Sequence, residues 1–220
     1  MKFEDVLIGP QRLPGRFESP DGADAVIVFA QGSGNGHLSK RNETVAGVLH
    51  GCGFATLRYD LLTPDEAEDR RNSFDIDLLA ERVDEAVTWV HGHHRYRHAR
   101  VGLLGSGTGT AAALRTAIGR PELVWAVVSR GGRPDLVGDS LSQVTAPTLL
   151  IVGGQDAVVL GLNRGAMGRL GGECRLEVVP HASHLFDEPG AIDIVARAAA
   201  SWFERHLSTS PCQVSAFQSA

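Results

Sequence analysis

Short apolar runs alternate with segments of helical periodicity along most of this 220-residue chain, and this alternation restricts the fold more than any other feature. Residues 25–30 are apolar throughout, which is typical of a strand buried on both faces of a parallel sheet. Residues 76–92 instead place apolar side chains on one face of a helix. Strands that alternate with helices predict an α/β fold with a mainly parallel, doubly wound sheet.

We expect about eight strands, flanked by helices, in a single domain that covers residues 1–207. The first two strands, at residues 6–9 and 12–18, are expected to form an antiparallel hairpin. The other strands are expected at residues 25–30, 54–59, 101–104, 124–129, 148–152 and 175–179. The helices are expected at residues 39–51, 76–92, 108–118, 158–170 and 190–207. Residues 208–220 are mostly polar and lack periodicity, so we expect a flexible tail.

The charge and cysteine content exclude several classes of protein. A net charge of −5 favours neither nucleic acid nor an anionic membrane surface as a partner. The acidic pair at Glu4 and Asp5 is unlike a signal peptide, and no apolar run approaches the length of a membrane span. Cys52, Cys174 and Cys212 are widely spaced. We therefore expect a cytoplasmic protein with reduced thiols and no metal site.

The turn at residues 105–109 reads Gly-Ser-Gly-Thr-Gly and lies between an expected strand and an expected helix. This is the context of a nucleophile elbow, in which a glycine stands two residues before and two residues after the nucleophile. Gly105 and Gly109 hold those two positions, so Gly107 stands where the nucleophile belongs. Gly107 has no hydroxyl and cannot form an acyl-enzyme. Ser106 is a weaker candidate, because the residue before the nucleophile is expected to point into the sheet.

A glycine-rich loop follows the strand at residues 25–30. One interpretation makes it half of an oxyanion hole, with the N–H of Ser33 or Gly32 and the N–H of Thr108 as donors. The alternative is a plain turn or an anion-binding nest. Gln31, at the start of the loop, is a candidate substrate-binding residue together with Gly32.

Two further segments supply a carboxylate and a base. Asp156 follows an expected strand, where it can either orient an imidazole or simply cap a turn. His184 lies in the loop before the last helix and is a better base candidate than His181. The order elbow, aspartate and histidine, each after a separate strand, supports the first interpretation.

Arginines near strand ends leave several alternatives open. Arg130 and Arg133 lie on one glycine-rich loop and can clamp a substrate carboxylate or enolate, or they can pair with Asp135 or other surface acids. A structural ion pair is favoured for Arg58 and Asp60. The histidine-rich segment at residues 91–98 is expected to be a solvated loop on the face opposite the site.

The chain resembles the α/β-hydrolase superfamily, and within it the dienelactone-hydrolase-like esterases and lactonases. The segments that carry the resemblance are residues 29–34, 60–63, 105–109, 129–132, 150–156 and 184–186. The resemblance implies a cofactor-free hydrolase of esters or lactones, with Asp156 as the triad acid and His184 as the triad base. It departs from the family pattern at Gly107, where serine or cysteine is expected, and at Gln31, where histidine is usual.

Three functions fit these residues. The first is an ester or lactone hydrolase whose nucleophilic serine is replaced by Gly107. That replacement can be natural or engineered. The second is a general-base enzyme that uses His184 and Asp156 without a covalent step, for C–C cleavage, elimination or cyclisation of an enolisable substrate. The third is a non-catalytic protein that binds a small ligand. The last helix also offers a face for a homodimer.

Overall fold

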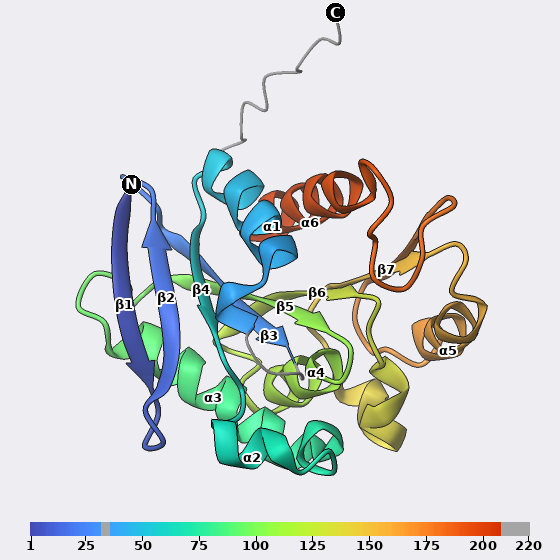
Figure 1. Ribbon diagram of the computed structural model, residues 1–220, viewed down its shortest axis with the longest axis horizontal. Coiled ribbons are helices and arrows are strands. Elements are labelled where there is room, and N and C mark those ends of the chain that lie inside the picture. The colour runs from blue at the N-terminus through green and yellow to red at the C-terminus, as the bar shows by residue number, and fades with distance from the viewer. Residues whose placement is uncertain (32–35, 208–220) are drawn as a thin grey trace, which may run out of the picture.

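The computed structural model describes residues 1–31 and 36–207 and contains an eight-stranded sheet with helices on both faces (Figure 1). The strand order is β1-β2-β4-β3-β5-β6-β7-β8, in which β2 runs antiparallel to its neighbours and the later strands run parallel. The strands are β1 (Lys2–Ile8), β2 (Leu13–Ser19), β3 (Ala25–Gln31), β4 (Ala55–Tyr59), β5 (Arg100–Ser106), β6 (Val124–Arg130), β7 (Thr148–Gly153) and β8 (Cys174–Val179). The predicted fold class is confirmed.

The helices form two layers around the sheet (Figure 1). One layer holds α1 (Lys40–Gly51) and α6 (Ala191–Leu207), which pack against each other and share an apolar core with one face of the sheet. The other layer holds α3 (Ile76–Gly92), α4 (Gly109–Gly119) and α5 (Ala157–Met167). The short helix α2 (Pro64–Glu68) and the 3-10 turns η1 (Gly36–Leu38), η2 (Asn72–Phe74) and η3 (Pro134–Gln143) were not predicted. The homodimer stays a prediction.

Helix α2 escapes a search for apolar periodicity because none of its residues is buried. Its start is instead fixed by a capping box. The Thr63 side chain accepts a hydrogen bond from the Glu66 N–H, and the Glu66 carboxylate accepts one from the Thr63 N–H. Such reciprocal caps satisfy N–H groups that have no partner inside the helix.

The buried polar pairs near β4 differ from the expected one. Arg58 does not pair with Asp60 but with Glu18 on β2, at 2.6 Å from Nη2 to Oε2. Asp60 accepts from the N–H of His37 and lies 2.9 Å from its Nδ1. The correction follows from strand pairing: Arg58 lies opposite Arg16 on β2, so Glu18 is its diagonal neighbour across the sheet, whereas Asp60 comes after the end of β4.

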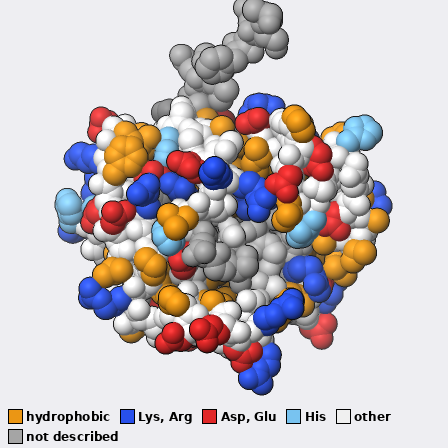
Figure 2. Space-filling view, in the orientation of Figure 1, with side chains coloured by type: hydrophobic (Ala, Val, Ile, Leu, Met, Phe, Trp, Pro, Cys, Tyr) orange, Lys and Arg blue, Asp and Glu red, His pale blue; other side chains and the backbone are white. Residues whose placement is uncertain are grey.

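Most positions of the segment at residues 91–98 are exposed, as expected, but two of its rings pack against the rest of the protein. The His93 ring packs beside Phe17 and Trp89, and the Tyr96 side chain is buried with its hydroxyl bonded to Ser19. No cluster of three or more metal-ligating side chains occurs within residues 1–31 and 36–207. In the same part of the chain, no helix is long and apolar enough to span a bilayer. On the face shown in Figure 2, charged and apolar side chains are mixed.

Two glycines allow helix α4 to approach the sheet closely. A Cβ atom placed on Gly105 would lie 2.5 Å from the Cα of Thr110, and one placed on Gly109 would lie 2.6 Å from the carbonyl carbon of Ala30. Real Cβ atoms essentially never come this close to backbone atoms. Both positions therefore require glycine if β3, β5 and α4 are to keep their spacing.

We expect Gly109→Ala to lower the free energy of unfolding by about 3 kcal/mol, because the added methyl group forces α4 away from β3. Gly47→Ala is the matched control, since Gly47 lies on the exposed side of α1 with nothing within 4 Å of its Cβ position. That control should gain roughly 0.5–1 kcal/mol. Urea unfolding of both variants measures the difference, and equal stability would show that the approach tolerates a side chain.

Candidate active site

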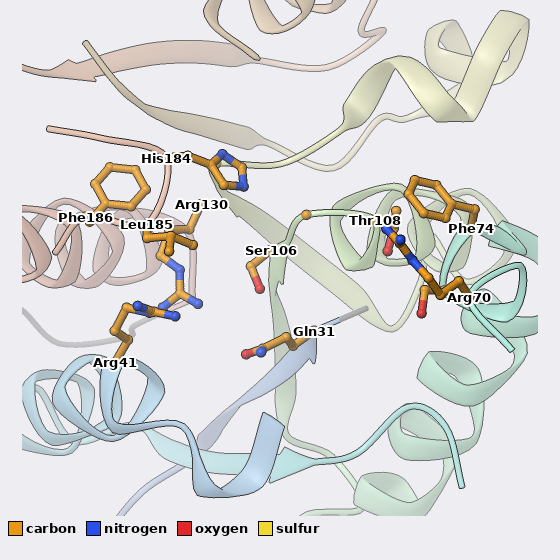
Figure 3. Close-up of a pocket in the computed structure, with 13 residues that line it drawn as sticks. Gln31, Arg41, Arg70, Phe74, Ser106, Thr108, Arg130, His184, Leu185 and Phe186 are labelled. Carbon is orange, nitrogen blue, oxygen red and sulfur yellow. The ribbon is translucent and has the colours of Figure 1, made fainter. Parts of the chain in front are cut away.

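A pocket of about 350 Å³ opens at the carboxyl ends of β3, β5 and β6 (Figure 3). Ligands of open α/β sheets bind at this edge, because loops after neighbouring strands converge there. The lining comes from well-separated regions of the described chain: Gln31, Arg41, Arg70, Ser73, Phe74, Ser106, Gly107, Thr108, Arg130, Gly131, His184, Leu185 and Phe186. Gly32 and Ser33, two of the predicted site residues, lie outside the described residues.

Gly107 lies at the tip of the turn between β5 and α4, with φ at +56°. A Cβ atom placed there would meet no described heavy atom within 4 Å, in contrast to the two flanking glycines. The Gly107 carbonyl accepts hydrogen bonds from the N–H groups of Arg133 and Thr110, at 3.0 and 3.3 Å. The turn is therefore held firmly, while its outer side stays open to the pocket.

Thr108 occupies the N-cap position of α4, and its side chain makes no capping hydrogen bond. Its backbone N–H donates to no acceptor within the described residues. The N-terminal N–H groups of a helix lack partners inside the helix and attract negative charge. The Thr108 N–H is therefore available to a carbonyl oxygen that gains negative charge at this point.

His184 and Asp156 are joined by a short hydrogen bond of 2.6 Å from Nδ1 to Oδ2. Asp156 follows β7, and His184 lies in the loop between β8 and α6. A carboxylate accepts the Nδ1 proton, so the neutral ring keeps Nε2 as its basic nitrogen. The His184 side chain is 51% exposed and lines the pocket, whereas His181 lies outside the lining.

Asp156 has a second partner. Its Oδ1 accepts a hydrogen bond from the Val159 N–H at 3.2 Å, so the same carboxylate caps the start of α5. The sequence left turn capping and imidazole orientation as alternatives, and the structure shows both contacts at once. Helix α5 thereby fixes the carboxylate that holds the imidazole.

The last residues of three neighbouring strands form a polar row. Gln31 on β3 pairs in register with Ser106 on β5, and Ser106 pairs with Arg130 on β6. Ser106 was expected to point into the sheet, but it is partly exposed and lines the pocket with the other two. The reason is that this row is the final one before the strands end, so its side chains border the pocket rather than a packed layer.

Arg130 is 7% exposed and is held through Asn42 on α1. Its Nη2 donates to the Asn42 Oδ1 at 2.9 Å, and the Asn42 amide donates to the Gln31 Oε1 at 2.7 Å. Burial, and then the charge of Arg41, lowers the pKa of Arg130 to about 10, which leaves it protonated at neutral pH. Arg130 does not make the predicted surface pair. Arg133, the other arginine of this loop, makes it as one of the two alternatives predicted, at 2.7 Å from Nη2 to the Asp135 Oδ2.

Several lining residues were missed by the sequence analysis. Arg70 lies just before η2 and Phe74 ends it, while Leu185 and Phe186 follow His184 directly. Arg70 stands within a charged stretch that resembles an ordinary solvated surface, so the local sequence does not indicate that Arg70 borders a pocket. Leu185 and Phe186 could have been identified as lining residues, because they lie within the segment at residues 184–186 that carries the resemblance.

Most of the chain is similar to proteins of one hydrolase family. Residues 13–210 match the model of the Dienelactone hydrolase family. The chain belongs to this family. A crystal structure of a dienelactone hydrolase from Anabaena variabilis ATCC 29413 is 46% identical, with a TM-score of 0.89 over 94% of this chain and 98% of that one. Est1E from Butyrivibrio proteoclasticus is 13% identical with a TM-score of 0.77, covers 92% of this chain and 98% of its own, and supports the fold alone.

Two curated proteins of Mycobacterium tuberculosis, from strains CDC 1551 / Oshkosh and ATCC 25618 / H37Rv, carry the name "Putative phosphoribosyl transferase". Each is 50% identical to this member of the dienelactone hydrolase family over 202 residues, which make up 92% of this chain. The match covers 46% of each relative. The chain therefore spans about half the length of these curated relatives.

The positive φ of Gly107 predicts a stability cost for any side chain there. We expect Gly107→Ala and Gly107→Ser each to lower the free energy of unfolding by about 1 kcal/mol, because an L-residue is strained in the left-handed region. The melting temperature should fall by roughly 2–4 °C while the fold stays intact. Thermal unfolding followed by circular dichroism measures both, and a rise in either variant would argue against the elbow geometry.

Proposed function

We propose that the protein hydrolyses a carboxylic ester or lactone, with water rather than a side chain as the nucleophile. One observation carries the proposal: the His184–Asp156 pair lies at the same pocket as Gly107, which provides open space but no hydroxyl. A general base that faces a turn without a nucleophile can act directly on water. Membership of the dienelactone hydrolase family supports the substrate class.

The proposed reaction has two proton transfers. The Nε2 of His184 accepts a proton from water, and the water oxygen bonds to the carbonyl carbon. The carbonyl oxygen becomes an oxyanion that accepts a hydrogen bond from the Thr108 N–H. The imidazolium, stabilised by Asp156, then returns the proton to the leaving alkoxide as the C–O bond breaks. The products are an acid and an alcohol, or one hydroxy acid from a lactone.

Transfer of a phosphoribosyl group is a poorer proposal for this chain. The name belongs to relatives of which the matched region forms 46%. That region corresponds to the part of this chain that matches the dienelactone hydrolase family. We therefore propose hydrolase chemistry for this chain. The transferase name describes the full-length relatives, not the matched region alone.

We expect His184→Ala to lower the rate of p-nitrophenyl acetate hydrolysis by about 100-fold to 10,000-fold, because general-base assistance contributes about that much. Asp156→Asn should also slow the reaction, since an amide no longer favours the protonated Nδ1 tautomer. The asparagine oxygen can still accept from the Val159 N–H, so α5 keeps its cap. Steady-state kinetics of folded variants measures both effects.

His181→Ala is the control for this pair, because His181 is exposed and does not line the pocket. Its rate should match that of the original chain. A His184→Ala variant that hydrolyses ester at the original rate would contradict the proposal. So would an original chain that shows no hydrolysis above the buffer rate.

We expect Gly107→Ser to change the mechanism to covalent catalysis, since the added Cβ enters open space beside the base. Rapid-mixing kinetics should show a burst of p-nitrophenol, and intact mass spectrometry should detect an acetylated protein. Gly107→Ala is the matched variant, with the same backbone strain and no hydroxyl. It should be slower than the original chain, because its methyl group occupies the proposed position of the attacking water.

Two results would separate the remaining explanations. Activity that appears only in Gly107→Ser would identify a hydrolase scaffold in which Gly107 has silenced catalysis. Acetylation of Ser106 in the original chain would instead show that the partly exposed Ser106 hydroxyl is the nucleophile. Either result would overturn direct attack by water.

A further inference from the structure

Two arginine side chains come together on one side of the pocket. Figure 3 shows Arg41 and Arg130 near each other, with Arg70 and Phe74 on the opposite side. The charge of Arg41 acts on Arg130 strongly enough to contribute to its lowered pKa. Like charges placed close together repel, so this arrangement is unfavourable unless an anion lies between them.

Arg130 has no negative partner among the described residues. Its one hydrogen-bond partner there is the neutral amide oxygen of Asn42, and its Nη1 is buried without a hydrogen bond. Arg41 is bound to Asp187 at 2.7 Å. Arg70 makes no ion pair within the described part of the chain, and no carboxylate lines the described pocket. Two of the three guanidinium charges are therefore uncompensated there.

A buried cation without an anion is costly, and a donor without an acceptor adds to that cost. Such a group at a pocket wall lowers the stability of the protein, and groups of this kind are typical of binding sites. The Nη1 of Arg130 is a donor without an acceptor among the described residues. Guanidinium groups suit oxygen anions, to which they donate in parallel pairs.

We infer that the substrate of the proposed hydrolysis carries a phosphate monoester, held by Arg130 and Arg41. This inference rests on the proposed function for its role in the reaction, although the binding itself can be measured without turnover. Two guanidinium groups border this side of the pocket, so a phosphate monoester, with a charge of about −1.5 to −2 at neutral pH, is attracted there more strongly than a carboxylate with a single charge. Its tetrahedral oxygens can also accept from two arginines that approach from different directions.

The proposed anion site and the proposed catalytic base share one pocket. Arg130 and His184 both line it (Figure 3). A phosphate held by Arg130 and an ester carbonyl near His184 can therefore belong to the same substrate. Binding energy from this remote group can position the ester for attack.

The test is isothermal titration calorimetry of the full chain with methyl phosphate at about pH 7.5, where its second proton is lost. Dimethyl phosphate, a monoanion of similar shape, and acetate are the comparison ligands. We expect methyl phosphate to bind at least about tenfold more tightly than either, a difference of roughly 1.4 kcal/mol. If dimethyl phosphate or acetate bound as tightly as methyl phosphate, the inference would be overturned.

Arg130→Met tests the residue itself, because methionine keeps much of the apolar stem and removes a buried charge. We expect this variant to fold and to lose most of its preference for methyl phosphate. Arg133→Met is the matched control, since Arg133 pairs with Asp135 and does not line the pocket. Unchanged binding by Arg130→Met would overturn the inference, and Arg130→Lys serves as a second variant if the first does not fold.

Failure of this inference and failure of the proposed function give different results. Selective methyl phosphate binding by a chain that hydrolyses no ester would retain the anion site and remove the hydrolase proposal. Ester hydrolysis that depends on His184, in a chain that binds no methyl phosphate, would do the reverse.

Discussion

The close approach of α4 to β3 and β5 is the constraint on which the site depends. Gly105 and Gly109 leave no room for a Cβ atom, so the turn between them is drawn tightly over the end of the sheet. That turn places Gly107 at a positive φ and leaves the Thr108 N–H, at the amino end of α4, without an acceptor among the described residues. Two packing requirements thus produce an open position and a hydrogen-bond donor side by side.

A second constraint is the polar connection between the sheet and α1. Asn42 accepts from Arg130 and donates to Gln31, so one helical side chain fixes two residues from strands on opposite sides of β5. The connection holds a guanidinium group at the pocket with its charge unneutralised by any described residue. Two hydrogen bonds of Asn42 thus hold the positions of Gln31 and Arg130 at the pocket wall, which is the arrangement that the proposed anion site requires.

The sequence was sufficient for the fold because each strand and most helices carry their own periodic signal. Residues 25–30 and 76–92 show this plainly, and both became regular elements in the expected places. The strand order and the direction of Ser106 had no such local signal. The predicted partner of Arg58 was also wrong, because its actual partner Glu18 lies on β2, and the pairing of β2 with β4 is a long-range feature without a local sequence signal. Arg70 was missed for a related reason, since a charged stretch looks alike whether or not it borders a pocket.

The two members of the proposed catalytic pair carry different weight as evidence. Asp156 caps α5 as well as contacting His184, so a chain that had lost all catalysis would still benefit from it. His184 has no such second role, because its side chain is half-exposed and Asp156 is its one hydrogen-bond partner in the described chain. An exposed histidine held in one orientation by a carboxylate contributes little to folding. The position of His184, rather than the presence of Asp156, is therefore the stronger structural argument for chemistry beside Gly107.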